Sequence, residues 1–249
     1  MADNIKSLLG DNAVSANEAA QKLASRCIDA VEKNDNTKIE DELDGLWSNI
    51  LAAAEQTPHD KQDKLVDILH AIKHLSQPAG KKLEIWGQEQ RWDELPTFGA
   101  KAREQLDSAQ EKSGEPFVNI NGFFARVTAA GVNDLSLFAI WVLREALEDP
   151  SEDKIAQQTS SDLLKAASVW FKYAAKDLAK ASKETKQFDG KIAKPGASLS
   201  ALKDEPGWRG FCEDRWKIWQ TRLTSLKNAD VQADAKSLVL QALDNIEKV

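Results

Sequence analysis

The chain has 249 residues, of which 42% are hydrophobic and 29% are charged, and its formal net charge is −7. This balance is typical of a globular protein that buries a core without needing a metal or a disulfide framework, and it argues against a disordered chain. The net negative charge disfavours general binding to nucleic acid, because the whole-chain field repels a polyanion.

Helical signals dominate the beginning of the chain. Ser15 with Glu18 forms a capping box that predicts the start of one helix, and Thr37 with Glu40 forms a second box. A third helix follows and is expected to stop at residues 77–80, where proline and glycine occur together. The pattern therefore predicts three helices before the first irregular segment.

The apolar side chains of residues 81–96 do not recur with a helical period. We predict a short helical turn and irregular chain here, held against the helices by Trp86 and Trp92. The alternative is that these two tryptophans line a groove. A helix over residues 97–112 is expected next.

The most apolar part of the chain covers residues 117–147 and predicts two helices at the centre of the core. Asn119 or Asn121 is expected to cap the first of them, and Gly131 is expected to end it in the left-handed conformation.

The C-terminal part predicts a long helix over residues 151–186, with a kink near Thr159. Glycine and proline then interrupt residues 187–207, which we interpret as a long mobile or lid-like connection. Two helices, over residues 208–227 and 230–248, complete the pattern.

Neither an internal repeat nor an alternating β-branched run is present. The predicted fold is all-α, a single irregular multi-helix bundle of about eight to ten helices without a regular repeat. We expect residues 1–249 to form a single helical domain.

Two arginines are expected beside the apolar core. Arg126 and Arg144 lie between apolar neighbours, so each needs a carboxylate partner, for which Glu145, Glu148 and Asp134 are available. The structural interpretation is a salt-bridged core, and the alternative is a guanidinium that anchors a ligand in a pocket.

Catalytic and metal-binding patterns are weak. His70 and His74 have the spacing at which two imidazoles can share a metal, but a glutamate beside the first is lacking, and His59 is the only other histidine. Neither a nucleophile elbow nor a glycine-rich phosphate loop is present. We expect no metal and no cofactor.

The chain is rich in tryptophan, with eight tryptophans against one tyrosine. Trp47, Trp141 and Trp170 lie on apolar helical stripes and are expected in the core. The segment over residues 208–222 interleaves basic and aromatic residues, a pattern that can stack bases or dock on an anionic membrane. Its apolar stripe favours ordinary helix packing instead.

Seven short blocks occur in an order that resembles a fungal family of uncharacterised intracellular helical proteins, catalogued only as a domain of unknown function. The blocks are Trp47–Ile50, Lys64–Leu69, Ile85–Gly87, Trp92–Pro96, Val118–Arg126, Arg144–Glu148 and Arg215–Trp219. The resemblance covers most of the chain and implies a fungal, cytosolic, helical protein. It implies no activity, substrate or catalytic residue.

The expected compartment is the cytoplasm, with the nucleus as an open alternative. A basic segment followed by an apolar run, which would indicate a secretory signal, is absent from the N-terminus, and no stretch approaches the roughly 18 apolar residues of a membrane span. Cys27 and Cys212 lie far apart among apolar neighbours and are expected to be reduced thiols.

Three functions stay open at the level of sequence. The first is a non-enzymatic protein-binding or scaffold module, the second a carrier or sensor of a small apolar ligand, and the third an enzyme of fungal secondary metabolism without a recognisable motif. The oligomeric state is not predicted. The candidate ligand-binding residues are Trp86, Trp92, Asn121, Phe124, Arg126, Trp141 and Arg144.

Overall fold

A computed structural model describes residues 2–202 and 208–249 of the chain. In this part of the chain it contains eleven α-helices, ten of them with seven residues or more, and a single two-stranded sheet, so the all-α prediction is confirmed. The chain divides into two compact units, Met1–Lys112 and Ser113–Val249. That these units fold together as one domain stays a prediction.

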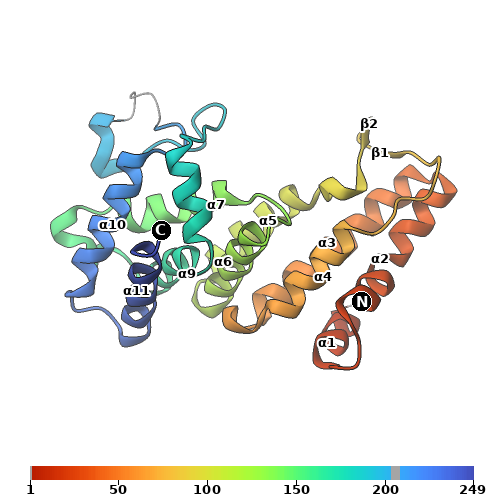
Figure 1. The fold of residues 1–249 in the computed structure, drawn as a ribbon, viewed down its shortest axis with the longest axis horizontal. Coiled ribbons are helices and arrows are strands. Elements are labelled where there is room, and N and C mark those ends of the chain that lie inside the picture. Colours follow the sequence, from red (N-terminus) through yellow and green to blue (C-terminus); the bar gives the residue numbers. More distant parts are fainter. Residues whose placement is uncertain (1, 203–207) are drawn as a thin grey trace. The chain divides into compact units, whose positions relative to one another are not determined.

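The first unit is a group of helices from which a small β-hairpin projects (Figure 1). Its elements are α1 (Ala2–Gly10), α2 (Ala16–Lys33), α3 (Asn36–Gln56), α4 (Asp63–Lys73), β1 (Leu83–Ile85), β2 (Gln88–Gln90) and α5 (Phe98–Lys112).

Helix starts in this unit follow the side chains that can accept a free backbone N–H. The capping box at Ser15 is confirmed at the start of α2. The box predicted at Thr37 is wrong, because Asp35 caps α3 by accepting a hydrogen bond from the backbone N–H of Lys38 at 3.2 Å. The carboxylate of Glu40 therefore does not cap α3 and instead accepts a hydrogen bond from the hairpin.

The segment over residues 81–96 differs from the prediction of a helical turn with irregular chain. Strands β1 and β2 pair antiparallel through a two-residue turn formed by Trp86 and Gly87, and only Trp92–Glu94 forms a short 3-10 helix. The strands have three residues each, and a Trp-Gly turn lacks the usual asparagine or aspartate before the glycine. Sequence patterning therefore gives little sign of this hairpin.

Two buried tryptophans hold the base of the hairpin to the helices. The indole N–H of Trp92 donates to the carbonyl of Ile72 at 2.7 Å, and that of Trp47 donates to the carbonyl of Pro96 at 2.8 Å. The Trp47 ring also meets Phe98 edge to face at 5.3 Å between centroids. The chain on the C-terminal side of the hairpin is therefore fixed by direct hydrogen bonds.

The second unit consists of helices around a long central one. Its elements are α6 (Gly114–Ala129), α7 (Ser136–Leu143) with a π-helical turn (Arg144–Glu148), α8 (Ile155–Gln158), α9 (Ser161–Lys183), a 3-10 helix (Ala197–Leu202), α10 (Glu213–Lys227) and α11 (Ala233–Ile246). In this unit α6 and α11 both pack against α9.

Helix α6 begins earlier than predicted, at Gly114, so Asn119 and Asn121 lie inside the helix and do not cap it. Asn121 is fully buried, and its side-chain oxygen accepts a hydrogen bond from the indole N–H of Trp170 at 2.9 Å. The predicted left-handed residue after the helix is confirmed, with a φ of 67° at Gly131.

The long helix predicted over residues 151–186 is broken at the expected place. Helix α8 ends before Thr159, whose hydroxyl donates to the carbonyl of Ala146 at 2.8 Å. Ser160 then caps α9 by accepting a hydrogen bond from the backbone N–H of Leu163 at 3.3 Å. Two side-chain hydrogen bonds thus stabilise the interruption.

A fully buried ion pair joins the π-helical turn to α10. The guanidinium of Arg215 donates from Nε to Oε1 of Glu148 at 2.7 Å and from Nη2 to Oε2 at 3.1 Å. The same carboxylate accepts the indole N–H of Trp219 at 2.7 Å and the backbone N–H of Gly196 at 2.9 Å. Both charged side chains have no exposed surface.

Arg215 also holds the connection before α10. Its Nη1 atom donates to the carbonyls of Ala193 at 2.7 Å and Gly210 at 2.8 Å, and Nη2 donates to that of Lys194 at 3.2 Å. With the two bonds to Glu148, all five guanidinium donors are used. Residues 203–207 of the connection lie outside the described residues, and its lid-like motion stays a prediction.

We expect Arg215→Met to lower the free energy of unfolding by about 3–5 kcal/mol, because it leaves the carboxylate of Glu148 buried without its charge partner. The control is Arg209→Met, which removes the same charge from an exposed side chain nearby. Urea unfolding followed by circular dichroism measures both. A difference of less than about 1 kcal/mol between the two variants would contradict the structural role given to the pair.

Candidate functional site

The seven candidate residues are divided between the two units. Trp86 and Trp92 belong to the first unit, and the other five belong to the second. Trp92 is buried and holds the hairpin through its indole N–H, as its structural interpretation predicted. Asn121 is buried as the hydrogen-bond partner of Trp170. These two side chains therefore have structural partners.

Phe124 and Trp141 form part of one aromatic row in the second unit. Phe138 lies between them, with centroid separations of 5.4 Å to Phe124 and 5.2 Å to Trp141. Phe124 has no exposed surface, and the indole N–H of half-buried Trp141 donates to the carbonyl of Ile192 at 2.7 Å. The row therefore packs the core and fixes a point on the connection before α10.

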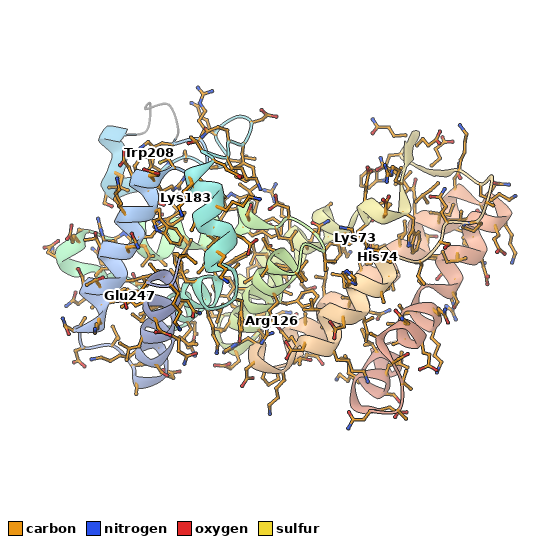
Figure 2. The ribbon with its side chains drawn as sticks, viewed as in Figure 1. Lys73, His74, Arg126, Lys183, Trp208 and Glu247 are labelled. Carbon is orange, nitrogen blue, oxygen red and sulfur yellow. The ribbon has the colours of Figure 1, made fainter. Side chains whose placement is uncertain are left out.

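The two candidate arginines do not pair with Glu148, whose partner is Arg215. Arg126 is labelled in Figure 2. Its guanidinium lies over the ring of Tyr173, with 3.9 Å from the guanidinium carbon to the ring centroid. This distance is that of a cation–π contact. Arg144 is half-buried in the π-helical turn.

Trp86 differs from the other seven tryptophans, which are all buried or half-buried. This residue is 73% exposed at the tip of the hairpin. Among the described residues, its indole has neither a hydrogen-bond partner nor a ring partner. Its backbone N–H donates to Oε1 of Glu40 at 3.1 Å. The structure thus presents a large apolar side chain to solvent on an anchored turn.

The conformation of this turn is unfavourable for tryptophan. Trp86 has a φ of 53° and Gly87 has a φ of 73°, as a type I′ hairpin turn requires. Glycine adopts this region freely, whereas for a bulky residue it is strained by roughly 1–3 kcal/mol. An asparagine in the place of Trp86 would suit the turn better.

Carboxylates surround the hairpin tip. Glu84 and Glu89 are directly opposite each other across the two strands, and both are exposed. Like charges at such positions are destabilising. Lys82 relieves part of the repulsion by donating to Glu89 at 2.8 Å, and this hydrogen bond raises the pKa of the Lys82 ammonium group. With Glu40, three carboxylates and one ammonium group flank the tip.

The charge of the chain is distributed unevenly. Residues 1–112 contain 14 Lys and Arg against 21 Asp and Glu, whereas residues 113–249 contain 19 of each. The whole formal charge of −7 therefore belongs to the unit that bears the hairpin. The local field at Trp86 favours cations.

A metal site, a membrane-spanning helix and a reactive thiol find less support. Among the residues that the structure describes, no group of three His, Cys, Asp or Glu is placed to hold a metal, and no helix has the length and apolarity to cross a membrane. The rings of His70 and His74 lie 4.3 Å apart between centroids. Burial raises the pKa of the Cys27 thiol to about 12, so it stays protonated.

The concavities described in the second unit have mainly charged and polar walls. One has a volume of about 350 Å³ and is lined by Asp134, Asp177, Lys180, Glu184 and Lys186 among others. Burial raises the pKa of Asp177, and the nearby Asp134 carboxylate adds to the effect. A second, which shares Lys180 and Glu184 with the first, has a volume of about 440 Å³.

These features define a helical protein with an exposed tryptophan on a short acidic hairpin. A family model described as "Protein of unknown function (DUF3632)" matches residues 47–223, and the chain belongs to this family. The matched range includes both the hairpin and the pair of Glu148 with Arg215. Neither the curated proteins nor the solved structures contain a match to the chain.

Trp86 stands out in the sequence, but the carboxylates around it and the pairing of Glu148 with Arg215 do not. Glu84 and Glu89 could have been found only by assuming the hairpin, since they meet across its strands. Arg215 lies four residues before Trp219 on an apolar helical stripe, and that position is a signal of burial.

We expect Trp86→Phe to remove most of the tryptophan fluorescence that caesium ions quench. The cation reaches the exposed indole and is attracted by the neighbouring carboxylates. The control is Trp216→Phe, which removes a half-buried indole that packs on Phe171 at 5.7 Å. Equal loss of the quenchable fraction in both variants would contradict the exposure of Trp86.

Proposed function

We propose that this chain is a binding protein that presents the Trp86 hairpin to a partner protein. The partner's docking face would combine an apolar pocket for the indole with a basic rim. The observation that carries the proposal is that Trp86 is 73% exposed while its backbone is held in the left-handed conformation of a turn. This arrangement is unfavourable for the isolated protein and favourable for recognition.

The hairpin is suited to act as a preorganised anchor. Tryptophan buries a large area with few rotatable bonds, and it is enriched among the residues that dominate binding energy at protein interfaces. The buried hydrogen bond of Trp92 fixes the chain next to the hairpin, so little ordering is left for the moment of binding.

The charge around the tip supports a basic partner. Glu84 and Glu89 repel each other in the free protein, and a lysine or arginine of a partner would relieve this repulsion. The acidic first unit would also speed the encounter with such a partner by electrostatic steering. The first function suggested by the sequence, a scaffold role, thus becomes the binding of a partner protein with a basic docking face.

The fungal origin and the cytoplasmic location implied by the family resemblance are part of this proposal. No comparable observation supports the carrier and enzyme alternatives. Phe124, one of the candidate ligand-binding residues, lies in the core without exposed surface.

Photo-crosslinking tests the proposal directly. A photoreactive phenylalanine analogue replaces Trp86 in cells that express the chain, and the control places it at Leu240, which is 42% exposed on α11. We expect one dominant crosslinked protein from position 86 that is basic, absent at the control position and lost at high salt. The same products from both positions, or none from position 86, would refute the proposal.

The carboxylates are tested separately once the crosslinked partner is purified. We expect Glu84→Gln with Glu89→Gln to slow association by about three- to tenfold and to weaken its salt dependence, because two steering charges are lost. The control pair is Glu32→Gln with Glu111→Gln, which removes two exposed charges elsewhere in the first unit. Equal effects of the two pairs would show that only net charge matters.

A further inference from the structure

The second unit carries a cluster of lysines that the hairpin proposal does not use. Lys176, Lys180 and Lys183 of α9 and Lys248 after α11 line the open concavity of about 440 Å³, together with Ala179, Glu184 and Val249. We name this surface the lysine concavity. Lys183 marks the C-terminal half of α9 in Figure 2.

Two helices bring these ammonium groups together. Along α9, Lys176, Lys180 and Lys183 follow one another at four and three residues, so they share one face of the helix. The side chain of Asn245 in α11 donates to the carbonyl of Lys172 in α9 at 2.8 Å. This hydrogen bond fixes the end of α11 against α9 and so places Lys248 at the same face.

The lysine concavity is locally basic in a unit without formal net charge. Residues 172–194 contain seven Lys and three Asp or Glu. Lys180 lies 3.9 Å from Glu184, and Lys248 pairs with Asp244.

The two remaining lysines of the concavity keep their charge available. Lys176 and Lys183 are exposed, and neither has a carboxylate within ion-pair distance among the described residues. Asp177, the neighbour of Lys176, lines the concavity of about 350 Å³.

The helix dipole explains only part of this pattern. Lysines in the last turn of a helix are stabilised by its partial negative charge, which accounts for Lys180 and Lys183. That effect fades within one turn, so it does not account for Lys176. Lysines four residues apart on a helix repel each other. An anionic ligand would turn this repulsion into attraction.

We infer that the lysine concavity binds a compact ligand that carries two or more phosphate groups, either free in solution or as the headgroup of a lipid. Lysine binds phosphate as a mobile point charge and needs no planar geometry. The backbone positions of Lys176 and Lys183 are about 10 Å apart along the helix, a span that suits several phosphates better than one. The concavity has the volume of a small-molecule site.

Binding assays with defined probes test this inference. Inositol hexakisphosphate and inorganic triphosphate represent the free source and are titrated by calorimetry. Vesicles of phosphatidylcholine with or without a phosphatidylinositol bisphosphate represent the lipid source and are tested by co-sedimentation. The full chain is used throughout. The site variant is Lys176→Gln with Lys183→Gln, and the control is Lys154→Gln with Lys227→Gln, two exposed lysines of the same unit outside the concavity.

We expect saturable binding of at least one probe, weakened by about tenfold or more in the site variant and unchanged in the control. Binding of the soluble probes alone would identify a free polyphosphate, and binding of the vesicles alone would identify a lipid headgroup. Thermal unfolding confirms that both variants fold. No binding of any probe, or equal weakening in both variants, would overturn the inference.

Discussion

The irregular parts of both units depend on one constraint, the need of a buried indole N–H for an acceptor. Trp47 and Trp92 satisfy it at the carbonyls that flank the hairpin base, and half-buried Trp141 donates in the same way to the connection before α10. Trp170 and Trp219 satisfy it at buried side chains, Asn121 and Glu148. Each bond brings a large apolar ring into the core while it fixes polar chain, so burial and positioning come from the same residue. The tryptophan surplus of the composition is therefore mainly structural.

Trp86 is the tryptophan whose side chain is left exposed, and its surroundings indicate why. Its indole is exposed, its backbone lies in a region unfavourable for bulky residues, and Glu84 and Glu89 repel each other beside it. Features that destabilise the free protein are expected where a partner compensates them. In the lysine concavity of the other unit, like charges also gather, but they are positive. The two proposed sites would therefore attract chemically different ligands.

Local patterns in the sequence predict the helices well, because capping and apolar periodicity act within a few residues. Ser15 and the break at Thr159 are examples. The sequence does not predict the hairpin, because its turn carries Trp86 where a good turn former is expected. The pairing of Glu148 with Arg215 spans 67 residues, and only the packing of the whole unit brings them together. The sequence therefore marks Trp86 as a tryptophan outside the helices, but it does not show that this side chain is exposed.

The most direct test of the central claim, that Trp86 is kept for recognition and not for stability, is the free energy of unfolding of Trp86→Asn. Asparagine followed by glycine is the preferred pair for a type I′ turn. Urea unfolding, followed by circular dichroism, compares the variant with the natural chain. The account predicts that the variant is at least as stable, with a gain of up to about 1 kcal/mol from relief of the strained turn. A loss of more than about 1 kcal/mol would show that the indole stabilises the fold and would contradict the account.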